Sequence, residues 1–243
     1  MTVEISAIRA NLQKVQSDIE RAAIASGRDP AEIRLVVVTK TQPAETVRAV
    51  IAAGAQILGE NYPEEAAEKF LAMPAAAGVQ WHMIGHLQSR KAKLVARHFD
   101  FMHSLDNLSL AEKLNRQLGE EGRVLPVLLE FNVGGEESKS GWQAADESRW
   151  AAFLPVARAV ADLPNLNLQG LMTMPPLFDQ PEAVRPMFAR LRRLRDYLQD
   201  QLPDLSLPHL SMGTSGDFTA AIAEGSTFVR IGTAIVGPRH YAR

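Results

Sequence analysis

The feature of this 243-residue sequence that most constrains its fold is a regular alternation of short apolar segments with longer amphipathic ones. The short segments have the length and β-branched content of strands buried on both faces, as in a parallel sheet. We expect strands at residues 35–40, 55–59, 79–84, 99–104, 124–133, 166–172, 207–212 and 227–231. Eight such units favour a single (β/α)₈ TIM barrel over a doubly wound sheet, which is the alternative for a chain of this kind.

The amphipathic stretches between these strands predict the helices, and one extra helix precedes the first strand. Apolar residues at helical spacing indicate this extra helix over residues 4–26. Further helices are expected at 44–53, from Pro63, at 89–97, up to Leu118, at 145–162, over 184–198 and up to about Glu224. Since no linker rich in Pro, Gly or Ser divides the chain, we expect residues 1–243 to form one barrel domain.

Composition narrows the class of protein. The absence of cysteine excludes disulfides, thiolate metal sites and a cysteine nucleophile. The net charge of −2 gives no general reason to expect nucleic acid or an acidic membrane as partner. No apolar run approaches the ~18 residues that a membrane span requires, and the amino terminus lacks the apolar core of a signal peptide. We therefore expect a cytoplasmic protein, and a monomer.

Lys40 stands at the carboxyl end of the first expected strand, LVVVTK. In parallel α/β folds, that end of a strand is where ligands bind. A lysine there can be desolvated and lose part of its charge, which makes its amine a nucleophile towards an aldehyde. The alternative is an ordinary lysine that ends a strand and points to water, and this segment alone favours that alternative, so the choice depends on the rest of the chain.

Two turns of small residues follow the seventh and eighth expected strands, one containing Ser215 and the other Gly232 and Thr233. Free backbone N–H groups at the start of a helix can bind a phosphate, and a phosphate held after these two strands recurs in barrels. The alternative is that the glycines serve only the turns. A lysine facing a phosphate site suggests pyridoxal 5′-phosphate, which carries both an aldehyde and a phosphate. Arg230 would then point inward and keep the pyridine nitrogen unprotonated, which weakens the ring as an electron sink.

Six segments of the chain resemble the pyridoxal phosphate homeostasis protein family: LVVVTK, LGENY, WHMIGHLQSRK, LMTMPP, LSMGTSGDFTAAI and FVRIGTAIVG. The resemblance covers residues 5–239. This family is similar to the N-terminal barrel of alanine racemase, so the resemblance implies a barrel like those of the fold-type III pyridoxal phosphate proteins. It also implies a role in vitamin B6 and amino-acid balance, with apo-enzymes that need the cofactor as candidate acceptors.

By this resemblance Lys40 carries the cofactor as a Schiff base, Ser215, Gly232 and Thr233 hold the phosphate, and Arg230 contacts the pyridine nitrogen. Asn61 and His86 fall in family motifs near the cofactor without an assigned role. The expected cofactor-binding set is therefore Lys40, Asn61, His86, Ser215, Arg230, Gly232 and Thr233. No residue is expected to be catalytic. No metal site is expected either, because the four-residue spacing of His82 and His86 falls across a strand end and not on a helix.

The family differs from the racemases in one respect that bears on activity. Those enzymes add a C-terminal β domain whose tyrosine is the second proton-transfer base. This chain ends at Arg243, and Tyr241 lies too close to the terminus to replace that tyrosine. We therefore expect a carrier with little or no catalysis. Two alternatives stay open: a racemase or decarboxylase that uses the cofactor, and an aldolase in which Lys40 acts on a sugar phosphate.

A group of four arginines and one further lysine are expected to lie at the surface. Arg190, Arg192, Arg193 and Arg195 belong to a helix whose other face is apolar, so a solvated face is favoured over nucleic-acid binding. Lys139, in the loop 134–141, could reach a ligand or a second aldehyde, but a surface lysine is the favoured interpretation.

Overall fold

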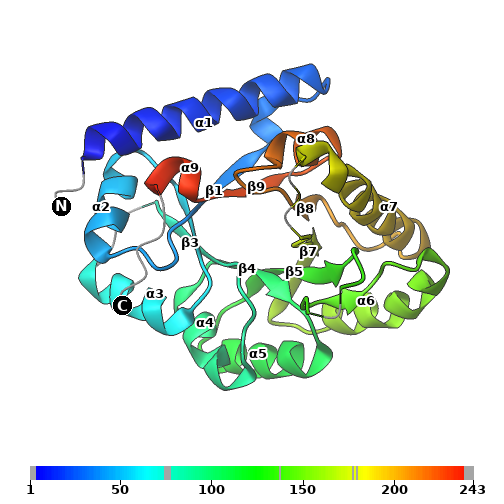
Figure 1. The fold of residues 1–243 in the computed structure, drawn as a ribbon. Helices are drawn as coiled ribbons and strands as arrows, with labels where there is room; N and C mark the ends of the chain where they lie inside the picture. The colour runs from blue at the N-terminus through cyan, green and yellow to red at the C-terminus, as the bar shows by residue number, and fades with distance from the viewer. Residues whose placement is uncertain (1–3, 74–77, 137, 177, 179, 238–243) are drawn as a thin grey trace.

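Eight parallel strands close into a barrel surrounded by helices in this computed structural model, which describes residues 4–73, 78–136, 138–176, 178 and 180–237 (Figure 1). The strands of the ring are β1 (Arg34–Val38), β2 (Ile57–Glu60), β3 (Gln80–Met83), β4 (Phe101–Leu105), β5 (Leu125–Asn132), β7 (Leu166–Met172), β8 (His209–Ser211) and β9 (Phe228–Ile231). Pairing of β4 with β5 and of β1 with β9 completes the ring. The predicted (β/α)₈ barrel is confirmed, and the doubly wound alternative is wrong.

The helices follow their strands around the outside of the barrel. They are α1 (Ile5–Ala25), α2 (Ala44–Ala52), α3 (Pro63–Ala72), α4 (Ala92–His98), α5 (Leu108–Glu120), α6 (Leu154–Ala161), α7 (Arg185–Gln201), α8 (Phe218–Ala223) and α9 (Thr233–Val236). Short 3₁₀ turns lie at η1 (Pro30–Glu32), η2 (Ser89–Lys91), η3 (Glu147–Phe153) and η4 (Pro181–Val184). The predicted extra helix is α1, which packs against α2, α8 and α9 (Figure 1).

Apolar side chains fill the space on both sides of the strands. The larger core lies between the ring and the helices, where α1 contributes Ile8, Leu12 and Val15. A smaller core inside the barrel includes Phe101 and Phe228, whose ring centroids lie 5.4 Å apart. Since burial of each large apolar side chain contributes about 1.5–3 kcal/mol, these two cores hold the ring closed.

Three of the differences between the structure and the predicted elements concern the first strand, the segment after β5 and the helix that follows it. The first strand ends at Val38 and not at Lys40, because a tight turn begins at Thr39. A short additional strand, β6 (Trp142–Gln143), pairs with the end of β5. The helix predicted over 145–162 is divided into η3 and α6, because Pro155 has no N–H to donate and is tolerated only in the first turn of an α-helix.

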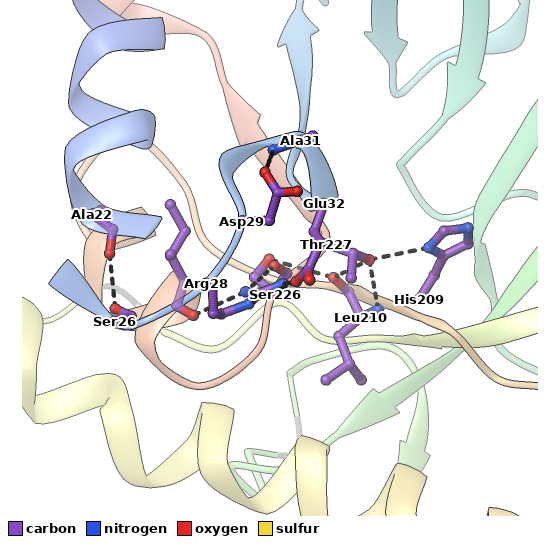
Figure 2. A network of polar contacts seen from close by, with 11 residues as sticks. Ala22, Ser26, Arg28, Asp29, Ala31, Glu32, His209, Leu210, Ser226 and Thr227 are labelled. Carbon is purple, nitrogen blue, oxygen red and sulfur yellow. Dashed lines mark hydrogen bonds and ion pairs between the residues drawn. The ribbon is translucent and has the colours of Figure 1, made fainter. Parts of the chain in front are cut away.

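Polar contacts seal the end of the barrel at which the strands begin (Figure 2). Arg28, in the loop after α1, donates hydrogen bonds to the carbonyl oxygens of Ile222 at 3.0 Å and Ser226 at 2.7 Å. The neighbouring Thr227 hydroxyl lies 3.2 Å from Nδ1 of His209 (Figure 2). These contacts join the loop after α1 to α8, β8 and the start of β9. The predicted ligand site lies at the opposite end of the barrel, where the strands end.

Candidate functional site

A cavity of about 430 Å³ lies at the carboxyl ends of the strands. Its walls come from the segments after β1, β2, β3, β5, β7, β8 and β9. Six residues of the predicted cofactor-binding set line it: Lys40, Asn61, Ser215, Arg230, Gly232 and Thr233. Lys40 and Thr233, which are 193 positions apart in the chain, therefore share one small-molecule-sized cavity.

Lys40 lies in a tight turn of residues 39–42 directly after β1. The Gln42 N–H donates to the Thr39 carbonyl oxygen at 3.1 Å, which closes the turn. Thr41, at its third position, has a φ of 61°, the left-handed conformation that a type II turn requires there. A β-branched residue is strained by about 1–2 kcal/mol in that conformation. The turn therefore places the half-buried Lys40 at the cavity wall at a cost that surrounding contacts must offset.

Two turns, 213–217 and 232–233, form another wall of the cavity, and we call them the glycine turns. Gly213 has a φ of 95°, and a Cβ there would lie 2.6 Å from the Ala221 Cβ. The N–H of Thr214 donates to Asp217 Oδ1 at 2.5 Å, which holds the first turn closed. A Cβ on Gly232 would lie 3.2 Å from the Val38 carbonyl oxygen. Glycine thus allows both turns to pack closely against their neighbours while they face the cavity.

Arg230 reaches the cavity from inside the barrel and is only 2% exposed. Its Nη1 donates to Ser211 Oγ at 2.5 Å and its Nη2 donates to the Thr173 carbonyl oxygen at 2.9 Å. Its buried Nε has no hydrogen-bond partner among the described residues. Burial lowers the pKa of Arg230 to about 10, so the guanidinium stays charged at neutral pH.

A column of polar side chains continues from Arg230 into the barrel. Ser211 Oγ lies 2.7 Å from His103 Nδ1, and His103 Nε2 lies 2.9 Å from His82 Nδ1. Burial lowers the pKa of His82 to about 3 and the pKa of His103 well below its ordinary value, so both rings are neutral. His82 therefore pairs with His103 and not with His86.

His86 is the one residue of the predicted set that does not line the cavity. Its Nδ1 lies 2.7 Å from Asp106 Oδ2, and its side chain is 54% exposed. It belongs to a neighbouring hollow that it shares with Tyr62 and Lys91. Asn61 lines both spaces, whereas His86 lines only the neighbouring hollow.

Other residues at this end of the barrel were missed or placed differently by sequence reasoning. Lys139 is half-buried and lines the cavity, which brings it closer to the predicted ligand site than the favoured interpretation as a surface lysine implied. Glu130, near the end of β5, is 7% exposed, and its Oε2 has no partner among the described residues. Burial raises the pKa of Glu130 to about 7, with the Asp106 carboxylate adding to the effect and Arg230 opposing it. The only signal in the sequence was a single acidic residue in an apolar strand.

The arginines of α7 form ion pairs on the surface. Arg190 and Arg193 pair with Glu147, and Arg192 pairs with Glu224. These carboxylates offset much of the positive charge, which agrees with the prediction of a solvated face. Among the residues that the structure describes, no helix is both long and apolar enough to cross a bilayer. The same residues contain no group of three or more His, Cys, Asp or Glu side chains placed to hold a metal ion, and Tyr241 lies outside them.

Comparisons with known proteins agree on one family. Residues 3–240 match the family described as alanine racemase, N-terminal domain. The chain is 45% identical over 238 residues to the pyridoxal phosphate homeostasis protein of Pseudomonas aeruginosa, covering 98% of both chains. It is 42% identical over 242 residues to the protein of that name from Escherichia coli K12, covering 97% of this chain and 98% of the relative. Among solved structures, PipY of Synechococcus elongatus PCC7942 with pyridoxal phosphate bound has a TM-score of 0.81 and 35% identity, covering 95% of this chain and 100% of PipY.

Proposed function

This chain belongs to the pyridoxal phosphate homeostasis protein family, and we propose that it binds pyridoxal 5′-phosphate at the barrel mouth and takes part in the homeostasis of that cofactor. The observation that carries the proposal is the convergence of Lys40, the two glycine turns and Arg230 on one cavity of about 430 Å³. These are the groups that an aldehyde, a phosphate and a pyridine nitrogen each require.

Each part of the cofactor has a matching group in the cavity. Lys40 would hold the cofactor through its amine, a nucleophile towards the aldehyde that the cofactor would supply. The glycine turns offer backbone N–H groups and the Ser215 and Thr233 hydroxyls to the phosphate. Arg230, which lines the cavity and stays charged at neutral pH, would offer a guanidinium hydrogen to the pyridine nitrogen. Asn61 lies at the edge of the same cavity.

Arg230 also supports a carrier over an enzyme. A ring nitrogen that accepts a hydrogen bond from a guanidinium stays unprotonated, and the ring then stabilises negative charge on a substrate poorly. We therefore favour a protein that holds and releases the cofactor with little or no catalysis, and treat an amino-acid racemase or decarboxylase as the competing function. We further propose that residues 1–243 act as one cofactor-binding domain, as a monomer in the cytoplasm, with apo-enzymes as acceptors.

Borohydride reduction tests this function directly. The protein is loaded with pyridoxal 5′-phosphate, reduced and digested, and the modified peptide is identified by mass spectrometry. We expect the label on Lys40, and we expect Lys40→Ala to lose the yellow absorption of the lysine-bound cofactor. Lys139→Ala removes the other lysine that lines the cavity and is expected to keep the label on Lys40. A label on another lysine of the unaltered protein would contradict the proposal.

A further inference from the structure

The turn that carries Lys40 is attached to a buried ion cluster behind the cavity wall. At its centre is Lys69 of α3, which is 3% exposed. The three hydrogens of its ammonium have three acceptors: the Thr39 carbonyl oxygen at 2.8 Å, Glu60 Oε1 at 2.7 Å and Glu65 Oε1 at 2.8 Å. Because an ammonium has three donors, Lys69 is saturated, and it joins β2 and α3 to the residue before Lys40.

The two carboxylates of the cluster also hold the turn itself, one on each side of Lys40. The Thr39 hydroxyl donates to Glu60 Oε1 at 2.6 Å. The Thr41 backbone N–H donates to Glu65 Oε1 at 2.6 Å. Both peptide neighbours of Lys40 are therefore tied to the same three charged side chains, and Thr41 is the only non-glycine residue with positive φ among those described. These contacts offset the strain that the turn carries.

We propose that Lys69, Glu60 and Glu65 form a positioning cluster that fixes the backbone of Lys40, so that its amine meets the cofactor aldehyde. This inference rests on the proposed function, because it assigns these residues a purpose only if Lys40 forms the bond. None of the three lines the cavity, so they act on the cofactor only through the Lys40 turn. A merely structural ion cluster between α3 and the barrel would alter stability without a selective effect on Lys40.

Glu65 is the residue that separates these two possibilities. Its side chain is 27% exposed, and its removal leaves Lys69 paired with the buried Glu60. Glu65→Ala removes the acceptor of the Thr41 N–H, whereas Glu65→Gln keeps an oxygen at that position. The matched control is Glu64→Ala, the preceding residue on the same helix, whose partner is Lys91, outside the turn.

Two ligands report separately on the turn and on the cavity. Covalent attachment of pyridoxal 5′-phosphate, followed by absorbance and trapped with borohydride, depends on the position of Lys40. Binding of pyridoxine 5′-phosphate, which has an alcohol in place of the aldehyde, reports on the phosphate and ring contacts alone. We expect Glu65→Ala to slow attachment about tenfold to a hundredfold, the effect of losing one hydrogen bond to a charged group. Its affinity for pyridoxine 5′-phosphate stays unchanged, Glu65→Gln recovers most of the rate, and Glu64→Ala matches the unaltered protein.

Several results would overturn the inference. Attachment to Glu65→Ala at the unaltered rate would show that the cluster does not position Lys40, while leaving the proposed function intact. Equal weakening of both ligands would show general damage to the cavity. If the unaltered protein forms no bond at all, the proposed function fails and this inference fails with it. Should Glu65→Ala not fold, Glu65→Asp keeps the charge but withdraws the oxygen from Thr41, and the same selective loss is expected.

Discussion

Replacement of Glu130 by glutamine tests the electrostatics of the barrel mouth. This carboxyl is buried at the end of β5, and burial is the main reason that its pKa is raised to about 7. The Asp106 carboxylate raises the pKa further, while Arg230 and His86 oppose the rise without cancelling it. Glutamine has nearly the same shape but never ionises, so the variant isolates the cost of the charge.

The sign and the size of the effect follow from proton linkage. Because the pKa of Glu130 is higher in the folded than in the unfolded chain, the folded state binds the proton more readily. The stability that this group contributes is fully present below pH ~4.5 and is lost as the pH rises through about 7. At about 1.4 kcal/mol per pKa unit, the rise from 4.5 to about 7 corresponds to about 3 kcal/mol.

Urea unfolding of the cofactor-free protein at a series of pH values measures this loss. We expect the free energy of unfolding of Glu130→Gln, measured relative to that of the parent, to rise by about 3 kcal/mol as the pH increases from ~4.5 to ~8. The variant must be compared with the parent at each pH. The buried, neutral His82 and His103 lower the stability of both proteins as the pH falls below about 6.5, and this effect cancels in the difference. Glu112→Gln, at an exposed position of α5, is the control. A difference between Glu130→Gln and parent that stays flat with pH would refute the reasoning.

Three further outcomes are expected. Thr233→Val weakens pyridoxal 5′-phosphate about tenfold to a hundredfold in a binding titration, but affects unphosphorylated pyridoxal much less; equal weakening would place the phosphate elsewhere. Gly213→Ala lowers the free energy of unfolding in urea by about 1–3 kcal/mol, because a side chain is strained at the φ of 95°, and an unchanged value would argue against a strained turn. The loaded protein incubated with L-alanine in deuterated water exchanges the α-hydrogen slowly, yet passes its cofactor to an apo-aminotransferase; fast exchange without transfer would favour the enzyme.

The barrel could be predicted because its repeating unit is visible in the local pattern. Each strand is a short apolar run and each helix has an apolar face, so the eight units could be counted without knowledge of their contacts. The differences arise where a single residue overrides the pattern. Pro155 interrupts a helix that periodicity alone would continue, and the tight turn at Thr39 ends β1 two residues before Lys40.

The candidate site was predictable in position but not in side-chain direction. The carboxyl ends of parallel strands converge in a barrel, so Lys40, Arg230 and Gly232 could be placed at one mouth from sequence. His86 also follows a strand, but it pairs with Asp106 and lines a neighbouring hollow, and no sequence pattern encodes that contact. For the positioning cluster, only the four-residue spacing of Glu65 and Lys69 on one helix was visible, because the other contacts depend on tertiary packing.

The polar column below Arg230 gives the inside of the barrel a direction of hydrogen-bond donation. A guanidinium only donates, so Ser211 Oγ accepts from it, and its positive charge favours a hydroxyl hydrogen that points away, towards His103 Nδ1. In that arrangement His103 carries its proton on Nε2 and donates to His82 Nδ1. One positive charge at the mouth thereby favours one tautomer of two histidines, with the hydrogen bonds of the column directed from the cavity into the barrel.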